Sequence, residues 1–321
     1  MKIRLLKFME RIGKAKNHIH GLIMIPVNID YKLTNPDTGG LAVLGGIKTL
    51  PYQYAFSVAL KRNGVYYCSG GIVSKTHVVT AAHCIFNNGN LVTEVTPLQV
   101  LVGSNDYTKP FGFLIDVDSV HIPKVYFKNL KNNINIGDIA VLKLLHHLDL
   151  SITNIQTRKL FLPEATSYKG TRNKFMGFGW NKFEKQNDID HQITFRSGDL
   201  MGQLRSIEVE VVSMNECRIH YKQELDSQYL VCGRIKQSST ESIDNVCIGD
   251  SGGPLVFSGD VLVGILIGYE ADCNDTTKPQ IYIRATAYKM FIQRVAFGRA
   301  QQSDTQSIIL PILPQFNDVN R

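Results

Sequence analysis

Ser251 lies in the glycine-rich run CIGDSGGPL, residues 247–255, directly after the carboxylate of Asp250. A serine hydroxyl is a weak nucleophile at neutral pH and needs a neighbouring base to take its proton. Histidine suits that role because its pKa lies near neutrality, so the same ring can return the proton to a leaving amine. A buried carboxylate would fix the tautomer of the imidazole and stabilise the imidazolium. The chemistry to look for is therefore acyl transfer.

Two further stretches supply a base and a carboxylate. His83 lies in TAAHC, residues 80–84, and Asp138 lies at the start of GDIAVLKL, residues 137–144. Each stretch alone has a simpler interpretation: a turn around Ser251, a solvated strand start at Asp138 and a structural histidine at His83. The three motifs occur together in the order His, Asp, Ser, which makes independent coincidence improbable.

With these three motifs the chain resembles the chymotrypsin-like (trypsin-fold) serine peptidases, from about residue 43 to residue 298. The resemblance implies a serine endopeptidase that works through an acyl-enzyme. His83 would be the base, Asp138 its carboxylate partner and Ser251 the nucleophile. The glycines allow a sharp turn that would aim the backbone N–H groups of Gly249 and Ser251 at the developing oxyanion. Neither a cofactor nor a metal is expected.

The resemblance also implies a zymogen. In the family, cleavage frees an apolar N-terminus whose amine pairs with the Asp before the nucleophile, here Asp250. The run VLGG, residues 43–46, resembles that new end, so Val43 and Asp250 are the expected activation pair. Ala42 precedes it, and no Arg or Lys lies between Lys32 and Lys48. A trypsin-like activating protease therefore has no obvious bond to cut.

The expected specificity pocket departs from the trypsin pattern. Family members that prefer basic side chains carry an Asp six residues before the nucleophile, and Asn245 occupies that position, with Asp244 one residue away. Tyr269 and Gln280 stand where the family places glycines in the pocket wall, and both would narrow it. We therefore expect a small or restricted side-chain preference in place of Arg/Lys specificity.

The elements that must position these residues are short strands separated by turns. Asn63-Gly64 between two apolar segments predicts a hairpin, and residues 139–144 and 261–267 read as buried strands. Ser213 and Glu216 fit a capping box before a helix, and Thr286 is the expected cap of a short C-terminal helix. This pattern predicts an all-β domain closed as barrels. The resemblance makes it two antiparallel β-barrels of the trypsin-like type, with a boundary at about 155–170.

The six cysteines allow complete pairing, but six thiols have fifteen possible connectivities. Reduced buried thiols remain an alternative, whereas zinc is poorly supported because no Cys-x-x-Cys pair occurs. The resemblance implies the pairs Cys68–Cys84, Cys217–Cys232 and Cys247–Cys273. Such disulfides imply an oxidising compartment and hence secretion, although the N-terminus shows no clear signal peptide.

Charge and composition limit the remaining classes of function. Residues 1–20 carry five of the seven net positive charges, so the nearly neutral remainder gives little reason to expect nucleic-acid binding. No apolar run is long enough to span a membrane.

We expect a leader or pro-segment over 1–42, the peptidase domain over 43–298 and a flexible tail over 299–321. Protein or peptide substrates, protein inhibitors and an activating protease are the expected partners. The rival hypothesis is a catalytically weak or inactive homologue that binds partners through the same cleft.

Overall fold

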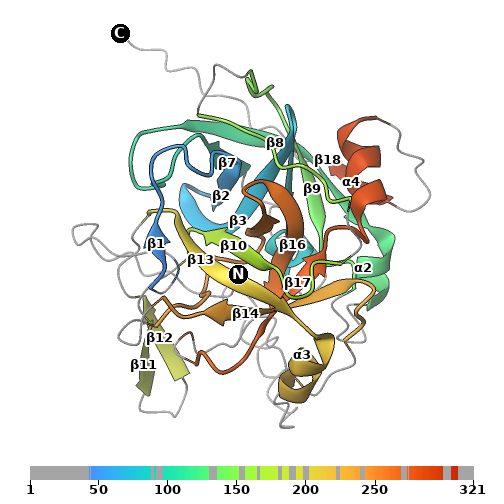
Figure 1. The fold of residues 1–321 in the computed structure, drawn as a ribbon. Helices are drawn as coiled ribbons and strands as arrows, with labels where there is room; N and C mark the ends of the chain where they lie inside the picture. The colour runs from blue at the N-terminus through green and yellow to red at the C-terminus, as the bar shows by residue number, and fades with distance from the viewer. Residues whose placement is uncertain are drawn as a thin grey trace, which may run out of the picture.

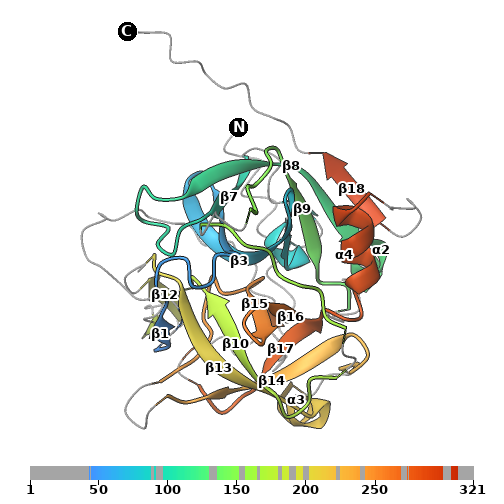
Figure 2. The ribbon, with the colours of Figure 1, turned by 45° about the horizontal axis from the view of Figure 1, so that its top comes forward.

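The computed structural model describes the body of the chain in segments. These are residues 43, 45–87, 90–91, 97–129, 136–151, 156–164, 167–179, 183–187, 193–197, 202–221, 225–238, 243–268, 273, 275–298 and 305–309. Strands dominate this part, and they close into two six-stranded antiparallel barrels. The predicted all-β fold with two barrels is confirmed. Figures 1 and 2 show one barrel in blue and green and the other in yellow and orange.

The first barrel is built from the N-terminal half of the domain. Its strands are β2 (Ser57–Arg62), β3 (Val65–Ser74), β4 (His77–Thr80), β7 (Leu98–Val102), β8 (Phe113–Pro123) and β9 (Ala140–Leu144). The long strand β8 pairs with β7 through its first half and with β9 through its second half. The register shifts between Val117 and Ser119, and such an irregularity bends a strand. That bend allows one strand to close the barrel.

The second barrel follows after the chain crosses between Leu144 and Arg172. Its strands are β10 (Arg172–Gly177), β13 (Arg205–Val212), β14 (Leu230–Lys236), β15 (Pro254–Phe257), β16 (Val261–Gly268) and β17 (Gln280–Arg284), with β13 pairing β14 to close it. The short strand β1 (Ile47–Lys48) pairs with the start of β13. Among the described residues, two two-stranded ribbons lie outside the barrels: β5 (Phe86–Asn87) pairs with β6 (Asn90–Leu91), and β11 (Phe183–Asn187) pairs with β12 (Ile193–Ser197).

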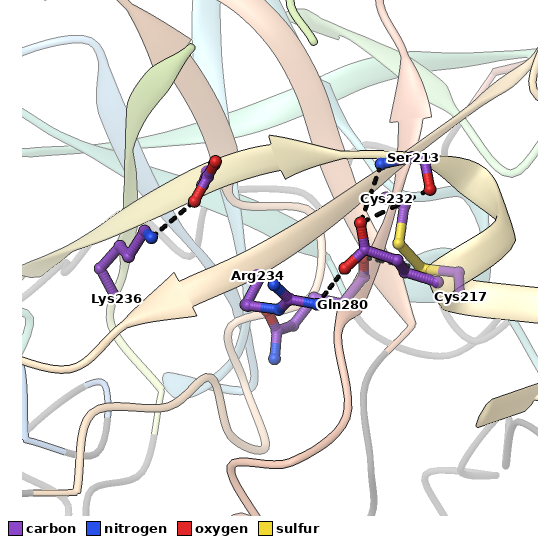
Figure 3. Close-up of polar contacts among 8 residues, drawn as sticks. Ser213, Cys217, Cys232, Arg234, Lys236 and Gln280 are labelled. Atoms are coloured by element: carbon purple, nitrogen blue, oxygen red, sulfur yellow. Dashed lines mark hydrogen bonds and ion pairs between the residues drawn. A yellow bond between two sulfur atoms is a disulfide. The ribbon is translucent and has the colours of Figure 1, made fainter. Parts of the chain in front are cut away.

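Local sequence signals explain several of these elements. Asn63 and Gly64 both have positive φ, as the predicted two-residue hairpin between β2 and β3 requires. Helix α3 (Met214–Tyr221) begins directly after Ser213, whose backbone N–H donates to Glu216 at 3.3 Å, as expected for a capping box (Figure 3). The Cys217–Cys232 disulfide then ties α3 to β14, as Figure 3 also shows.

The C-terminal part of the domain returns to the first barrel. Helix α4 (Lys289–Ala296) is the predicted C-terminal helix, and it lies beside β9 (Figure 2). Its cap was wrongly predicted: residues 285–288 form turns, so the helix begins after Tyr288 and not after Thr286. A second short helix, α2 (Lys124–Asn129), follows β8 and had no sequence signal.

Residues 305–309 differ from the expected flexible tail, because they form strand β18 (Thr305–Ile309). This strand pairs antiparallel with the last residues of β8, from Thr305 opposite Pro123 to Ile309 opposite Ser119. Ser119 and His121 pair with both β9 and β18, so these two strands lie on opposite edges of the second half of β8. β7 covers only the first half of β8 and leaves that second edge open to β18.

Three disulfides join the pairs that the family resemblance implied: Cys68–Cys84, Cys217–Cys232 and Cys247–Cys273. They close loops with sequence separations of 16, 15 and 26 residues. In the chain-entropy model each such loop contributes about 3 kcal/mol. Within the described residues, no helix has the length and apolar character needed to cross a bilayer.

Candidate active site

The three candidate catalytic residues come from loops at the ends of strands. His83 lies in the one-turn 3-10 helix η1 (Ala82–Cys84), directly after β4. Asp138 comes two residues before β9, the strand that pairs with β4. Ser251 comes three residues before β15 in the second barrel. Because Thr80 pairs with Ala140 across β4 and β9, the loops that carry His83 and Asp138 lie side by side.

Asp138 holds His83 through both of its carboxylate oxygens. Oδ2 lies 2.8 Å from Nδ1 of the imidazole, and Oδ1 accepts the backbone N–H of His83 at 2.9 Å. The carboxylate side chain is 1% exposed and the imidazole 18% exposed. This geometry fixes Nδ1–H as the donor to Asp138 and leaves Nε2 as the proton acceptor of the neutral ring.

The electrostatics of the pair favour a protonated imidazole. Burial alone lowers the pKa of His83, but the charge of Asp138 and its hydrogen bond outweigh burial and leave that pKa above its ordinary value. An imidazolium at this position is therefore stabilised, as a general base requires after it has taken a proton.

The loop that carries Ser251 is a tight turn, held by hydrogen bonds within the loop and by contacts from the first barrel. Within it, the N–H of Asp250 donates to the carbonyl of Cys247 and the N–H of Gly253 to the carbonyl of Asp250, both at 3.0 Å. From the first barrel, the N–H of Ser69 donates to the carbonyl of Ser251 at 2.8 Å. The Sγ atom of Cys84, the neighbour of His83, lies 3.8 Å from the same carbonyl. The backbone of Ser251 is thereby placed beside the segment that carries His83.

Asp250 is fully buried and accepts two backbone hydrogen bonds. Its Oδ1 atom accepts from the N–H of Gly179, and its Oδ2 atom from the N–H of Cys247, both at 2.8 Å. A Cβ atom at Gly179 would overlap the carboxylate, so only glycine permits this approach. Burial raises the pKa of Asp250 to about 7, although the two hydrogen bonds act in the opposite direction.

Two residues that the sequence analysis missed hold the backbone of the predicted oxyanion site. The hydroxyl of Tyr66, on β3, donates to the carbonyl of Gly249. The hydroxyl of Ser69 lies 2.8 Å from that of Tyr66 and 3.3 Å from the same carbonyl. The ring of Tyr66 stacks on that of Tyr107 at a centroid distance of 4.5 Å. No local motif marks these residues, because their partner is about 180 positions away in sequence.

Two of the three predicted pocket residues lie together and are buried, Asn245 at 3% and Gln280 at 2% exposure. The amide of Gln280 lies 3.4 Å from Oδ1 of Asn245 and 3.0 Å from the carbonyl of Lys278. Asn245 donates to the carbonyls of Cys273 and Asp275 at 2.9 and 3.0 Å. Among the described residues, Oε1 of Gln280 has no hydrogen-bond partner. Tyr269 lies outside the described residues.

The predicted activation segment is docked on the second barrel. Val43 is 0% exposed and belongs to the core cluster that contains Phe175 and Tyr282. The N–H of Gly46 donates to Oδ1 of Asp244 at 2.8 Å. The described contacts of this segment therefore include Asp244, a residue that the sequence analysis noted only as a neighbour of Asn245.

The chain is similar to known proteins in sequence and in fold. The family model described as Trypsin matches residues 43–292. The chain is 28% identical over 262 residues to a trypsin of Phaedon cochleariae, covering 81% of this chain and 89% of that protein. It is 27% identical over 256 residues to trypsin delta of Drosophila melanogaster, covering 78% and 87%. Among solved structures, neuropsin, a serine protease expressed in the limbic system of mouse brain, aligns with a TM-score of 0.62 at 23% identity, covering 79% of this chain and 99% of its own.

Proposed function

The chain belongs to the trypsin family of serine-type endopeptidases, and on this premise we propose that it hydrolyses peptide bonds through an acyl-enzyme formed on Ser251. The observation that carries the proposal is the His83–Asp138 pair, in which a buried carboxylate binds both the ring and the backbone of the histidine. Such a pair prepares the imidazole to accept a proton from a serine hydroxyl.

In the proposed reaction, Oγ of Ser251 attacks the carbonyl carbon of the substrate while Nε2 of His83 takes the hydroxyl proton. The resulting oxyanion is stabilised by the N–H groups of Gly249 and Ser251. His83 then gives its proton to the leaving amine, the C–N bond breaks and the acyl-enzyme remains. Water attacks the acyl group by the same route in reverse, which releases the acid and restores Ser251.

The proposed substrates carry a small or otherwise restricted side chain, other than that of Arg or Lys, before the cleaved bond. A substrate cation buried beside Asn245 would meet no carboxylate, and an unpaired buried charge is costly. Asp244 does not supply one, because its carboxylate already accepts hydrogen bonds from the N–H groups of Gly46 and Ser238. Gln280 further shortens the pocket, since its side chain is buried against Asn245.

The burial of Gln280 against Asn245 also favours one rival, a catalytically weak homologue that binds partners through the cleft. Active-site titration with a fluorophosphonate probe distinguishes the two hypotheses. We expect stoichiometric labelling of Ser251 in folded, processed protein and none in the variant Ser251→Ala. If correctly folded, processed wild-type protein took up no label, the enzyme hypothesis would be rejected and the binding hypothesis retained.

We further propose that the protein is secreted and processed before Val43. The three disulfides support an oxidising compartment. The burial of Val43 in the core of the second barrel supports a segment that docks there. N-terminal sequencing of the mature protein should therefore begin at Val43, and a start far from this residue would refute the boundary. Protein inhibitors and an activating protease remain the proposed partners.

A further inference from the structure

Arg205 and Asp244 are two buried side chains of opposite charge that the proposed chemistry does not use. Arg205, the first residue of β13, is 6% exposed, and Asp244 is 2% exposed. Burying a charge is unfavourable unless it is compensated by a partner or by hydrogen bonds. Burial lowers the pKa of Arg205, and the nearby charge of Asp244 opposes that effect. Their hydrogen-bond partners should therefore show what these two charges do.

Both side chains bind the same peptide group. The carbonyl of Gly45 accepts a hydrogen bond from Nη1 of Arg205, and the N–H of Gly46, at the other side of that peptide bond, donates to Oδ1 of Asp244 at 2.8 Å. Nη1 of Arg205 also donates to the carbonyl of Gly46 at 2.7 Å. Hydrogen bonds to charged groups are the stronger kind, so the Gly45–Gly46 peptide is held from both sides.

The sequence of residues 45–48 suits their contact with Arg205 and Asp244. Gly45 has a φ of +68°, and a Cβ atom there would overlap both the carboxylate of Asp244 and the carbonyl of Ile243. A residue other than glycine could not approach so closely. β1 continues the contact, with Ile47 opposite Ser206 and Lys48 opposite Arg205. Residues 45–48 therefore bind Arg205, Asp244 and β13 through their backbone groups.

Asp244 in turn leads directly to the nucleophile loop. Its own position is fixed by the N–H of Ser238, which donates to Oδ2 at 2.6 Å, and by two hydrogen bonds with the amide of Gln237. Three residues later, the N–H of Cys247 binds the carboxylate of Asp250, which directly precedes Ser251. Because only residues 245–250 separate Asp244 from Ser251, a displacement of Asp244 would be transmitted to the nucleophile.

We propose that Arg205 and Asp244 form a clamp on Gly45–Gly46 that orders the nucleophile loop while the chain is still joined before Val43. The clamp grips backbone groups of the intact chain, so it needs no newly freed amine. In the same state the carboxylate of Asp250 is satisfied by the N–H groups of Gly179 and Cys247. Arg205 and Asp244 are positioning residues, and the unprocessed chain retains an ordered nucleophile loop with measurable reactivity at Ser251. The reactivity, though not the clamp itself, rests on the proposed function.

Hydrogen–deuterium exchange on the full chain tests the clamp independently of activity. In a Ser251→Ala background, which prevents self-cleavage, we expect Arg205→Gln and Asp244→Asn to speed amide exchange about tenfold both at residues 45–49 and at residues 247–252. The matched controls Arg172→Gln and Asp118→Asn remove equal charges from exposed ion pairs and should leave both segments unchanged. Arg205→Lys, which keeps the charge but loses the planar guanidinium that binds both carbonyls, should give an intermediate effect and serves if the glutamine variant does not fold.

Exchange that rises only at residues 45–49 would overturn the coupling, because the clamp would then hold the segment without ordering the loop. Fluorophosphonate labelling of the intact chain with native Ser251 completes the test. We expect slow labelling before processing and a roughly tenfold slower rate in Asp244→Asn. If the processed protein labels and the intact protein does not, the clamp proposal fails and the proposed function stands. If neither labels while exchange shows the coupling, the proposed function fails and the clamp stands.

Discussion

The hydroxyl of Tyr66 in the first barrel donates a hydrogen bond to the carbonyl of Gly249 in the nucleophile loop of the second. The contact joins the two barrels at the backbone group that precedes Asp250. Gly249 is also one of the two proposed oxyanion donors, so a hydroxyl on β3 holds the backbone of a proposed catalytic residue in the other barrel.

Removal of this hydroxyl should lower turnover more than substrate binding. In Tyr66→Phe the ring can keep its stacking on Tyr107, but the carbonyl of Gly249 loses a donor. We expect kcat to fall roughly 3- to 10-fold, the equivalent of about 1 kcal/mol, with KM nearly unchanged. The neighbouring variant Tyr67→Phe is the control, because the Tyr67 hydroxyl has no hydrogen-bond partner among the described residues. Equal losses in both variants would contradict a positioning role for Tyr66.

Asp138→Asn should reduce activity and shift its pH dependence. Asp138 raises the pKa of His83 through its charge and hydrogen bond, against the lowering effect of burial. A general base works in its neutral form, so kcat/KM should rise with pH through the pKa of His83. The variant should lower kcat by about 10³- to 10⁴-fold and move the midpoint of the profile to lower pH. Steady-state rates between pH 5 and 9 measure both effects, with Asp118→Asn as a control that keeps the site intact.

Asp250 should make the unprocessed chain less stable at alkaline pH. Its pKa is raised by burial to about 7, whereas an unfolded aspartate titrates near 4. Between these values the native state binds the proton more tightly than the unfolded state does, so stability falls as pH rises through this window and stays low above it. Thermal unfolding at pH 5 and pH 8 should show this difference, and Asp250→Asn should reduce it.

A second comparison separates Asp250 from other titrating groups. If processing frees the amine of Val43 to pair with Asp250, the pKa of the carboxylate falls and its contribution to the pH dependence should shrink. A pH dependence that is equal in the wild type, in Asp250→Asn and in the processed protein would show that Asp250 does not titrate as proposed.

Gln280 should limit the size of the accepted side chain. In Gln280→Gly the buried amide that meets Asn245 is removed, which opens space beside Asn245. We expect kcat/KM for large apolar side chains to rise about tenfold relative to alanine, measured with a peptide library and normalised by active-site titration. Adding Asn245→Asp to this variant should raise cleavage after Lys and Arg, because it supplies the missing carboxylate. An unchanged profile in both variants would place the specificity-determining contacts elsewhere.

Much of the site could be predicted because its information is local. The motifs around His83, Asp138 and Ser251 each occupy a few consecutive residues, and the order of the motifs identified the family. The Asn63-Gly64 hairpin and the Ser213–Glu216 capping box were predicted equally well, since each depends on neighbouring backbone conformations. Thr286 wrongly predicted the start of the C-terminal helix: a cap residue acts only where the helix begins, and α4 begins after Tyr288.

By itself, the sequence determined the fold class and the motifs of a serine peptidase. It also contained an even number of cysteines, whose pairing only the family resemblance could suggest. Only the tertiary structure decided which distant groups hold these motifs in place. Tyr66 meets Gly249 across 183 positions, and Asp244 meets Gly46 across 198. Contacts of this kind leave no periodicity or spacing in the chain, because they arise when two closed barrels bring unrelated loops together. The same reason applies to β18, whose place depends on the part of β8 that β7 leaves unpaired.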